Sequence, residues 1–231
     1  METKFNRAYA REYKIIRGRR STRYFDKDRN VSNWEVILIL ESARWAPSAR
    51  NLQPYEFIVI RSKRKREKLA KIARQPQPKT APVSVIVLGD VERAGRIGEI
   101  SPHDVTTRRK GERMFIYMDA AAAIENMLLA AHSLGIGSLW VSAFDEEELV
   151  RLLEVPDNYR PLAIVCLGHE LRTPVVPPKR KLGEILHWER FRRREPDSSL
   201  FDFARRINEE FKEYLRDGEI TVSSARKKKS A

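Results

Sequence analysis

Residues 119–144 read DAAAAIENMLLAAHSLGIGSLWVSAF, a stretch that predicts a long helix, a tight turn and a short strand in succession. We expect the helix to span residues 113–134, because Gly135 stands where helices commonly end in the left-handed conformation. The small side chains of Asp119 to Ala123 allow this helix to pack closely against a neighbour. A strand over residues 138–142 should follow it.

Outward from this stretch, helices and strands mix without a regular alternation. A capping box at Ser32 and Glu35 starts a helix whose Val36–Leu40 run is apolar nearly all round, so we expect that helix to be buried. Pro47 should end it. Strands are predicted at residues 55–61, 83–89 and 162–168, and further helices at 3–17, 63–74 and 145–153. This irregular order favours an α+β fold over a doubly wound parallel fold.

The remaining segments carry weaker patterns. We expect a loop at 75–82, a mobile loop or short helices at 90–112, and a proline- and lysine-rich excursion at 171–182. Towards the C-terminus we predict an amphipathic helix at 198–216, a short strand at 219–223 and a disordered basic tail at 225–231. The chain should therefore comprise a main domain over 1–190 and a C-terminal extension over 191–231.

The formal net charge of +13 attracts anions such as nucleic acid, anionic lipid or phosphorylated small molecules. Part of the excess lies in basic runs that are typical of exposed faces or tails, at 63–66, 192–194 and 226–229. A nucleic-acid-binding module with interleaved aromatic residues is absent from the sequence. Nucleic acid is therefore the weaker alternative as a partner.

The single cysteine, Cys166, excludes a disulfide within the chain and, inside the apolar run 162–167, favours a core position over a nucleophile. The first twenty residues are polar and charged, unlike a signal peptide. No apolar stretch reaches the roughly 18 residues of a membrane helix. We expect a cytoplasmic protein without membrane contact.

The sequence lacks the fingerprints of several chemistries. No G-x-G-x-x-G follows a strand, no Walker-type loop or G-x-S-x-G elbow is present, and the four histidines lack metal-ligand spacing. We predict no metal site. If the chain is an enzyme, a bound cofactor is the expected source of its chemistry.

Two polar clusters suit a phosphate-bearing, planar cofactor. The first combines three guanidinium groups with two hydroxyls, which suits a phosphate, although a solvated basic turn has the same composition; it comprises Arg19, Arg20, Ser21, Thr22 and Arg23. The second is a proline-stiffened loop over 46–55 that joins the predicted buried helix to a strand. Its side chains offer hydrogen-bond donors and acceptors to a heterocycle, from Ser48, Asn51 and Gln53.

These stretches together resemble the nitroreductase family of flavoproteins. RRSTRYF (19–25) resembles its R-R-S-x-R-x-F motif. APSARNLQPYEFIVI (46–60) resembles its A-P-S-x-x-N-x-Q-P-W-x-F-V-V motif, with Tyr55 where tryptophan is commoner. The central helix and strand, the last core strand and the closing segment of the family are matched by 119–144, RPLAIVCLGHE (160–170) and PPKRKLGEILHWE (177–189).

The resemblance covers residues 15–190 and implies a central mixed/antiparallel sheet flanked by helices, in an interwoven homodimer with two FMN molecules at the subunit interface. The phosphate, ribityl chain and pyrimidine edge would be held by Arg19, Arg20, Ser21 and Arg23. The second cluster would contact the flavin together with the partner chain, through Pro47, Ser48, Ala49, Asn51 and, more weakly, Gln53. The other flavin face would be flanked by Trp140, Val141, Ser142 and Ala143, with a backbone N–H of Ser142 or Ala143 near N5. Lys179 or Arg180 would close on the phosphate.

The resemblance also implies a reaction. An FMN-dependent NAD(P)H oxidoreductase takes hydride from NADH or NADPH and passes it to a small acceptor, such as a nitroarene or quinone, in a ping-pong cycle. No side chain is assigned as a general acid. The alternatives are a non-redox flavin carrier and a basic nucleic-acid-binding protein. The 198–216 helix is expected to embrace the partner subunit.

Overall fold

The computed structural model describes residues 12–100 and 112–191, with Arg205 and Glu209. Contacts divide the chain into two compact units, Met1–Pro174 and Val175–Ala231. The expected helix at 198–216, strand at 219–223 and tail at 225–231 lie outside the described residues, as do the first residues of the predicted 3–17 helix. The expected division at residue 190 stays a prediction.

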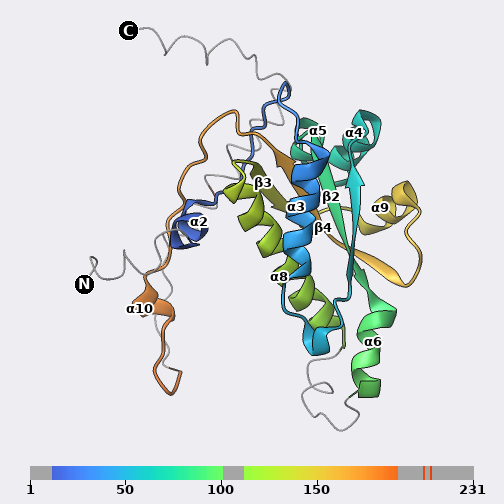
Figure 1. Cartoon of the computed structure of the whole chain (residues 1–231), viewed down its shortest axis with the longest axis vertical. Coiled ribbons are helices and arrows are strands. Elements are labelled where there is room, and N and C mark those ends of the chain that lie inside the picture. Colours follow the sequence, from blue (N-terminus) through green and yellow to red (C-terminus); the bar gives the residue numbers. More distant parts are fainter. Residues whose placement is uncertain (1–11, 101–111, 192–204, 206–208, 210–231) are drawn as a thin grey trace. The chain divides into compact units, whose positions relative to one another are not determined.

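A four-stranded antiparallel sheet forms the centre of the first unit (Figure 1). Its order is β1-β2-β4-β3, with β1 at Tyr55–Ile60, β2 at Val83–Asp90, β3 at Gly137–Val141 and β4 at Tyr159–Gly168. The two central strands, β2 and β4, are buried along almost their whole length, which explains their continuous apolar sequences. The predicted strands and the α+β class are confirmed.

One face of the sheet is covered by α3 (Asn33–Arg44) and α8 (Glu112–Ser133), which pack against each other (Figure 1). Alternate residues of the strands point into this core, since side chains along a strand alternate between faces. The core combines Val36, Ile39 and Ala43 of α3 with Ala123, Ile124 and Met127 of α8 and with Val85 and Val165 of the sheet.

The expectation that α3 is buried all round is wrong. Its capping box forms as predicted, with Glu35 N–H donating to Ser32 Oγ and Ser32 N–H to the Glu35 carboxylate. However, Trp34 is 65% exposed and Ile37 is 53% exposed. Packing against α8 and the sheet covers one side of the helix, and its apolar outer side remains available to another partner.

The expectation that no stretch is apolar enough for a membrane helix is also wrong by length and composition, because Met114–Ser133 of α8 meets that test. The inward side chains of α8 nevertheless lie in the core with β2 and β4. Its apolar character is that of a core helix, so the pattern that resembles a membrane span is explained by packing.

The other face of the sheet is covered by α4 (Lys63–Ile72), α5 (Gln77–Thr80) and α9 (Glu146–Leu153), which bury Leu69 and Leu149 against Ile86 and Ile164. The predicted loop at 75–82 is partly helical, because the proline rings lie at the N-cap and first turn of α5, where no N–H is needed. Within 90–112, residues Val91–Ile100 form a single helix, α6.

The second unit is described over residues 175–191 with Arg205 and Glu209. It contains the short helix α10 (Leu182–Ile185), which begins at the last residue of the predicted proline- and lysine-rich excursion 171–182. Arg180 pairs there with Glu184, with 4.0 Å between Nε and Oε2.

Candidate functional site

The arginine-rich segment, residues 19–23, lies along the open edge of β3. It follows α2 (Glu12–Gly18), which ends one residue beyond the predicted 3–17 helix. Ser21 forms a parallel bridge with Ser138, and Thr22 N–H donates to the Ser138 carbonyl at 2.9 Å. Thr22 is fully buried and its hydroxyl donates to Glu170 Oε1 at 2.8 Å. Backbone pairing to the sheet therefore places the segment.

Gly137 permits this close approach of the arginine-rich segment to β3. A Cβ added there would lie 2.6 Å from Thr22 Oγ1 and 2.8 Å from Glu170 Cγ, closer than real Cβ contacts. The requirement at Gly137 is therefore for space, because the carbons and oxygens of Thr22 and Glu170 occupy the position of a side chain.

The cations of the segment differ in their engagement. Arg19 pairs with Glu125 of α8, with 3.8 Å between Nε and Oε1. Arg20 turns back on the end of α2 and donates to the carbonyls of Arg17 and, at 2.7 Å, Arg19, while its buried Nε has no partner. Arg23 is exposed. The segment thus combines a buried unpartnered N–H donor with exposed positive charge, a donor set that fits a phosphate.

The polar loop over residues 46–53 is braced by its own side chains. Ser48 Oγ accepts from Gln53 N–H at 3.0 Å, and Gln53 Nε2 donates to the side chain and carbonyl of Asn51 at 3.0 and 3.2 Å. Arg50, Asn51 and Gln53 have positive φ angles of 52°, 57° and 48°. Gln53 therefore orients Asn51, and the loop keeps a backbone that is unfavourable for residues other than glycine.

Asp119 of α8 anchors this loop, a role that the sequence did not suggest. Ala49 N–H donates to its carboxylate, at 3.0 Å to Oδ2 and 3.2 Å to Oδ1. The residue is 6% exposed, and burial raises the pKa of Asp119 although the Ala49 hydrogen bond opposes the shift. The only signal in the sequence is an acidic residue at the start of the Ala-rich run, and we interpreted that run only as small side chains that allow close packing.

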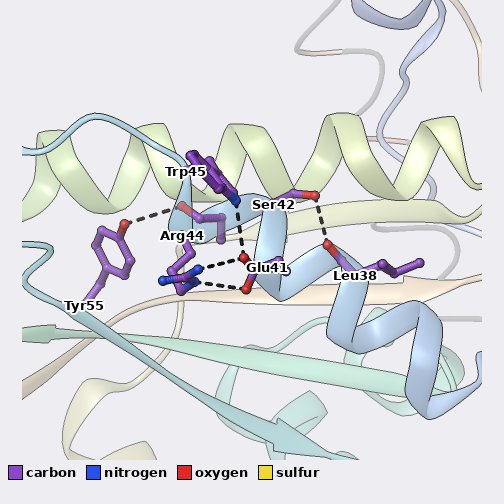
Figure 2. A network of polar contacts seen from close by, with 7 residues as sticks. Leu38, Glu41, Ser42, Arg44, Trp45 and Tyr55 are labelled. Carbon is purple, nitrogen blue, oxygen red and sulfur yellow. Dashed lines mark hydrogen bonds and ion pairs between the residues drawn. The ribbon is translucent and has the colours of Figure 1, made fainter.

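Side-chain hydrogen bonds hold the C-terminal end of α3, which directly precedes the polar loop (Figure 2). Arg44 donates twice to the Glu41 carboxylate, at 2.8 and 2.9 Å, and thereby lowers the pKa of Glu41. Trp45 Nε1 donates to the same carboxylate at 3.2 Å, and Tyr55 of β1 donates its hydroxyl to the Ala43 carbonyl at 3.4 Å. Trp45 is 77% exposed, so an oriented indole stands immediately before the loop.

The third predicted group lies at the end of β3. Trp140 is partly exposed and Val141 is buried, whereas Ser142 and Ala143 are exposed beyond the last strand residue. Asp145 then caps α9 by accepting from Glu148 N–H at 2.9 Å. Ser142 and Ala143 therefore form an exposed link between β3 and α9.

The arginine-rich segment and the polar loop contact α8 at different residues. Gly18 lies against the His132 ring near the end of α8, and Arg19 pairs with Glu125, whereas Ala49 binds Asp119. Along the helix, at about 1.5 Å per residue, Asp119 lies about 9 Å from Glu125 and about 20 Å from His132.

Cys166 takes no part in either group. It is fully buried in β4, and burial raises the pKa of its thiol to about 12. At neutral pH the thiolate is not populated. The prediction of a core cysteine is confirmed.

An antiparallel sheet with helices on both faces, a cationic edge segment and a braced polar loop defines an α+β protein equipped for a phosphate-bearing, planar ligand. The Nitroreductase family model matches residues 16–169, and the chain belongs to this family. It is therefore an oxidoreductase of the nitroreductase type, and the family prediction is confirmed.

Known relatives agree with this assignment. The chain is 34% identical over 161 residues to a protein of Archaeoglobus fulgidus provisionally named an NADH dehydrogenase/NAD(P)H nitroreductase, covering 68% of this chain and 83% of that protein. It is 27% identical over 208 residues to the FMN reductase [NAD(P)H] of Bacillus subtilis, covering 87% and 82%.

Solved structures share the fold. NfrA2 of B. megaterium superposes with a TM-score of 0.71 at 25% identity, covering 90% of this chain and 85% of that chain. The NADPH:FMN oxidoreductase of Vibrio harveyi, in complex with NAD+, has a TM-score of 0.69 at 23% identity, covering 87% and 85%.

Proposed function

We propose that this chain is an FMN-dependent NAD(P)H oxidoreductase that reduces small acceptors, such as nitroarenes or quinones, by a ping-pong mechanism. The observation that carries the proposal is the arginine-rich segment, whose backbone pairs with β3 while the buried Nε of Arg20 has no partner and Arg23 is exposed. The names of the B. subtilis and V. harveyi relatives support FMN and a nicotinamide as the ligands.

In this proposal different clusters of the chain bind different parts of the cofactor. The phosphate, ribityl chain and pyrimidine edge are assigned to Arg19, Arg20, Ser21 and Arg23, with Lys179 or Arg180 as a further cation. The ring packs on the polar loop, through Pro47, Ser48, Ala49, Asn51 and Gln53. Its other face is assigned to Trp140, Val141, Ser142 and Ala143, where a backbone N–H of Ser142 or Ala143 binds the N5 edge.

The donor set fits FMN. A guanidinium binds phosphate through two parallel hydrogen bonds and stays charged at all relevant pH values, and Arg20 keeps a buried Nε without a partner. When bound, FMN supplies the hydride transfer between the nicotinamide and the acceptor. The chain positions both substrates in turn, excludes water and holds positive charge beside the pyrimidine edge, which stabilises the reduced ring.

A homodimer completes the site. Large apolar side chains are exposed on the outer sides of α3 and α8, a feature that marks interaction surfaces; they are Trp34, Ile37, Trp45, Met114, Tyr117 and Met118. In a two-fold dimer the same patch meets itself. If α8 pairs with its copy in antiparallel fashion, the loop anchored at Asp119 faces the partner's arginine-rich segment, so each flavin contacts both chains.

The dimer is tested by Met118→Glu, because a charge in an apolar self-associating patch opposes association. Sedimentation should give a dimer for the wild type and a monomer with weakened FMN binding for the variant. A wild-type monomer that binds FMN at full strength would contradict a shared site. We expect the enzyme to work in the cytoplasm.

The redox function is tested by the visible absorption spectrum of the purified protein, followed by NADH or NADPH without oxygen. A flavin spectrum that bleaches with one donor is the expected result, and it names that donor. A flavin spectrum that neither donor bleaches would favour the carrier alternative. A colourless protein that takes up no added FMN, but binds nucleic acid with a steep salt dependence, would favour the alternative of a basic nucleic-acid-binding protein.

A further inference from the structure

We propose that Asp119 is the positioning residue of the flavin site: its buried carboxylate holds the polar loop, through Ala49 N–H, in the conformation that receives the ring. This inference rests on the proposed function, which assigns Pro47, Ser48, Ala49 and Asn51 to the flavin. It adds a residue that lies behind the loop and reaches the cofactor only through it.

Asp119 and Ala49 are joined by a direct hydrogen bond that is largely shielded from solvent. Both carboxylate oxygens lie within hydrogen-bond distance of the Ala49 nitrogen, at 3.0 and 3.2 Å, and Asp119 is 6% exposed. The two residues are 70 positions apart in the chain. The bond therefore joins α8 to the loop across the fold, in surroundings where hydrogen bonds to a charged group are strong.

The loop requires such an anchor because its backbone is unfavourable. Three residues out of four at positions 50–53 adopt the left-handed region, and all three carry side chains. Such conformations persist when surrounding contacts over-determine them. The bonds among Ser48, Asn51 and Gln53 stabilise the shape of the loop, but they do not attach it to the domain.

Two other hydrogen bonds attach the chain before the loop and near its end. Asn126 of α8 donates to the Ser42 carbonyl at 3.1 Å, and Arg93 of α6 donates its Nε to the Leu52 carbonyl. Asp119 acts between these points, on a residue of the flavin motif itself. Through Glu125, α8 also pairs with Arg19, so one helix contacts both cofactor clusters.

A buried acid at this position is costly unless it serves a contact. The next residue, Ala120, is buried with a methyl group, and no ion pair to Asp119 is present in the part of the chain that the structure describes. Burial raises the pKa of Asp119, because the ionised form loses hydration. The compensating interaction within the described residues is the Ala49 N–H, which makes this bond the reason for the acid.

The experiment compares Asp119→Leu, which lacks the acceptor, with Asp119→Asn, which retains an acceptor oxygen. Ile124→Ala is the matched control, since Ile124 is a buried apolar residue of the same helix. Ala49→Pro removes the donor instead. Proline suits the first position of the 3-10 helix, and Ser48 already has the extended backbone (φ −140°, ψ 154°) preferred before proline.

Two readouts are measured on each holoenzyme: the FMN dissociation constant, and hydrogen exchange of the peptide that covers residues 46–53. Asp119→Leu and Ala49→Pro should weaken FMN binding about tenfold or more and accelerate exchange in that peptide. Asp119→Asn should restore both to within about threefold, because the acceptor is present. Ile124→Ala should lower stability and leave both readouts unchanged.

The outcomes separate this inference from the proposed function. Unchanged FMN binding and exchange in both Asp119→Leu and Ala49→Pro would overturn the positioning role, as would failure of Asp119→Asn to restore them. If the wild type takes up no FMN, the proposed function fails, and the exchange of the 46–53 peptide still decides whether Asp119 holds the loop. If Asp119→Leu does not fold, Ala49→Pro gives the same decision.

Discussion

The arginine-rich segment and the polar loop are positioned by opposite means. Segment 19–23 is attached through its backbone, which pairs with β3, and its cations remain at or near the surface. Loop 46–53 is shaped by its own side chains and attached to α8 through Asp119, a buried carboxylate. The attachment of the segment depends on space beside Gly137, and that of the loop on a charged acceptor.

This difference has a physical reason. A segment that binds a phosphate must keep its guanidinium groups free, so its backbone makes the structural bonds. A loop that packs on a ring must present a fixed backbone, so a side chain from behind holds it. Mutations should therefore affect the two regions in different ways.

The largest effect is expected from Gly137→Val. The new side chain would overlap Thr22 and Glu170, so segment 19–23 must move off the edge of β3. Overpacking of this kind costs about 1–3 kcal/mol, and FMN binding should be lost with the displaced arginines. Urea unfolding and FMN titration measure the two losses. Gly183→Ala, where no atom lies within 4 Å of the added Cβ, is the control. Wild-type FMN affinity in Gly137→Val would show that the segment does not bind the cofactor.

Arg19→Ala should have the next largest effect, without large loss of stability. Removing one charge-assisted bond to phosphate should weaken FMN binding about tenfold, seen as flavin released on dilution. Arg29→Ala, which removes an exposed arginine outside the segment, should retain FMN. Equal retention by both variants would exclude Arg19 from the phosphate site.

Asp119 should produce a pH dependence that the segment lacks. Burial raises the pKa of Asp119 above its unfolded value of about 3.9, so between these two values the folded chain holds a proton that the unfolded chain has lost. This carboxyl therefore makes the free energy of unfolding fall as pH rises from about 4 through the folded pKa.

Asp119→Asn removes this titration. We expect the difference in unfolding free energy, variant minus wild type, to increase as pH rises from about 4 to 7. Urea unfolding at several pH values measures it. Parallel stability curves across this range would mean that Asp119 is not desolvated in solution.

The smallest effect is expected from Glu125→Gln. The pair with Arg19 is 3.8 Å long, and the Glu125 side chain is 49% exposed, so its removal should change stability by less than about 0.5 kcal/mol. FMN binding should stay within about twofold of the wild type. A tenfold loss would mean that Glu125 is needed to aim Arg19 at the phosphate.

Much of the fold could be predicted from local pattern. The α3 capping box, the apolar strands and the turn at Gly135 (φ 73°) appear where short-range rules place them. The α5 helix was missed because prolines read as breakers, although they are tolerated in a first turn. The exposed side of α3 was missed because an apolar sequence does not say which partner covers it.

The sequence by itself determined the family, the order of helices and strands, and the two motifs that mark a cofactor site, because these depend on residue type and spacing along the chain. Only the tertiary structure decided that Asp119 reaches Ala49, that Gly137 leaves room for Thr22, and that the two clusters contact α8 at different residues. These contacts join residues far apart in sequence. Their energies depend on burial and distance, which the folded chain sets and which no local pattern contains.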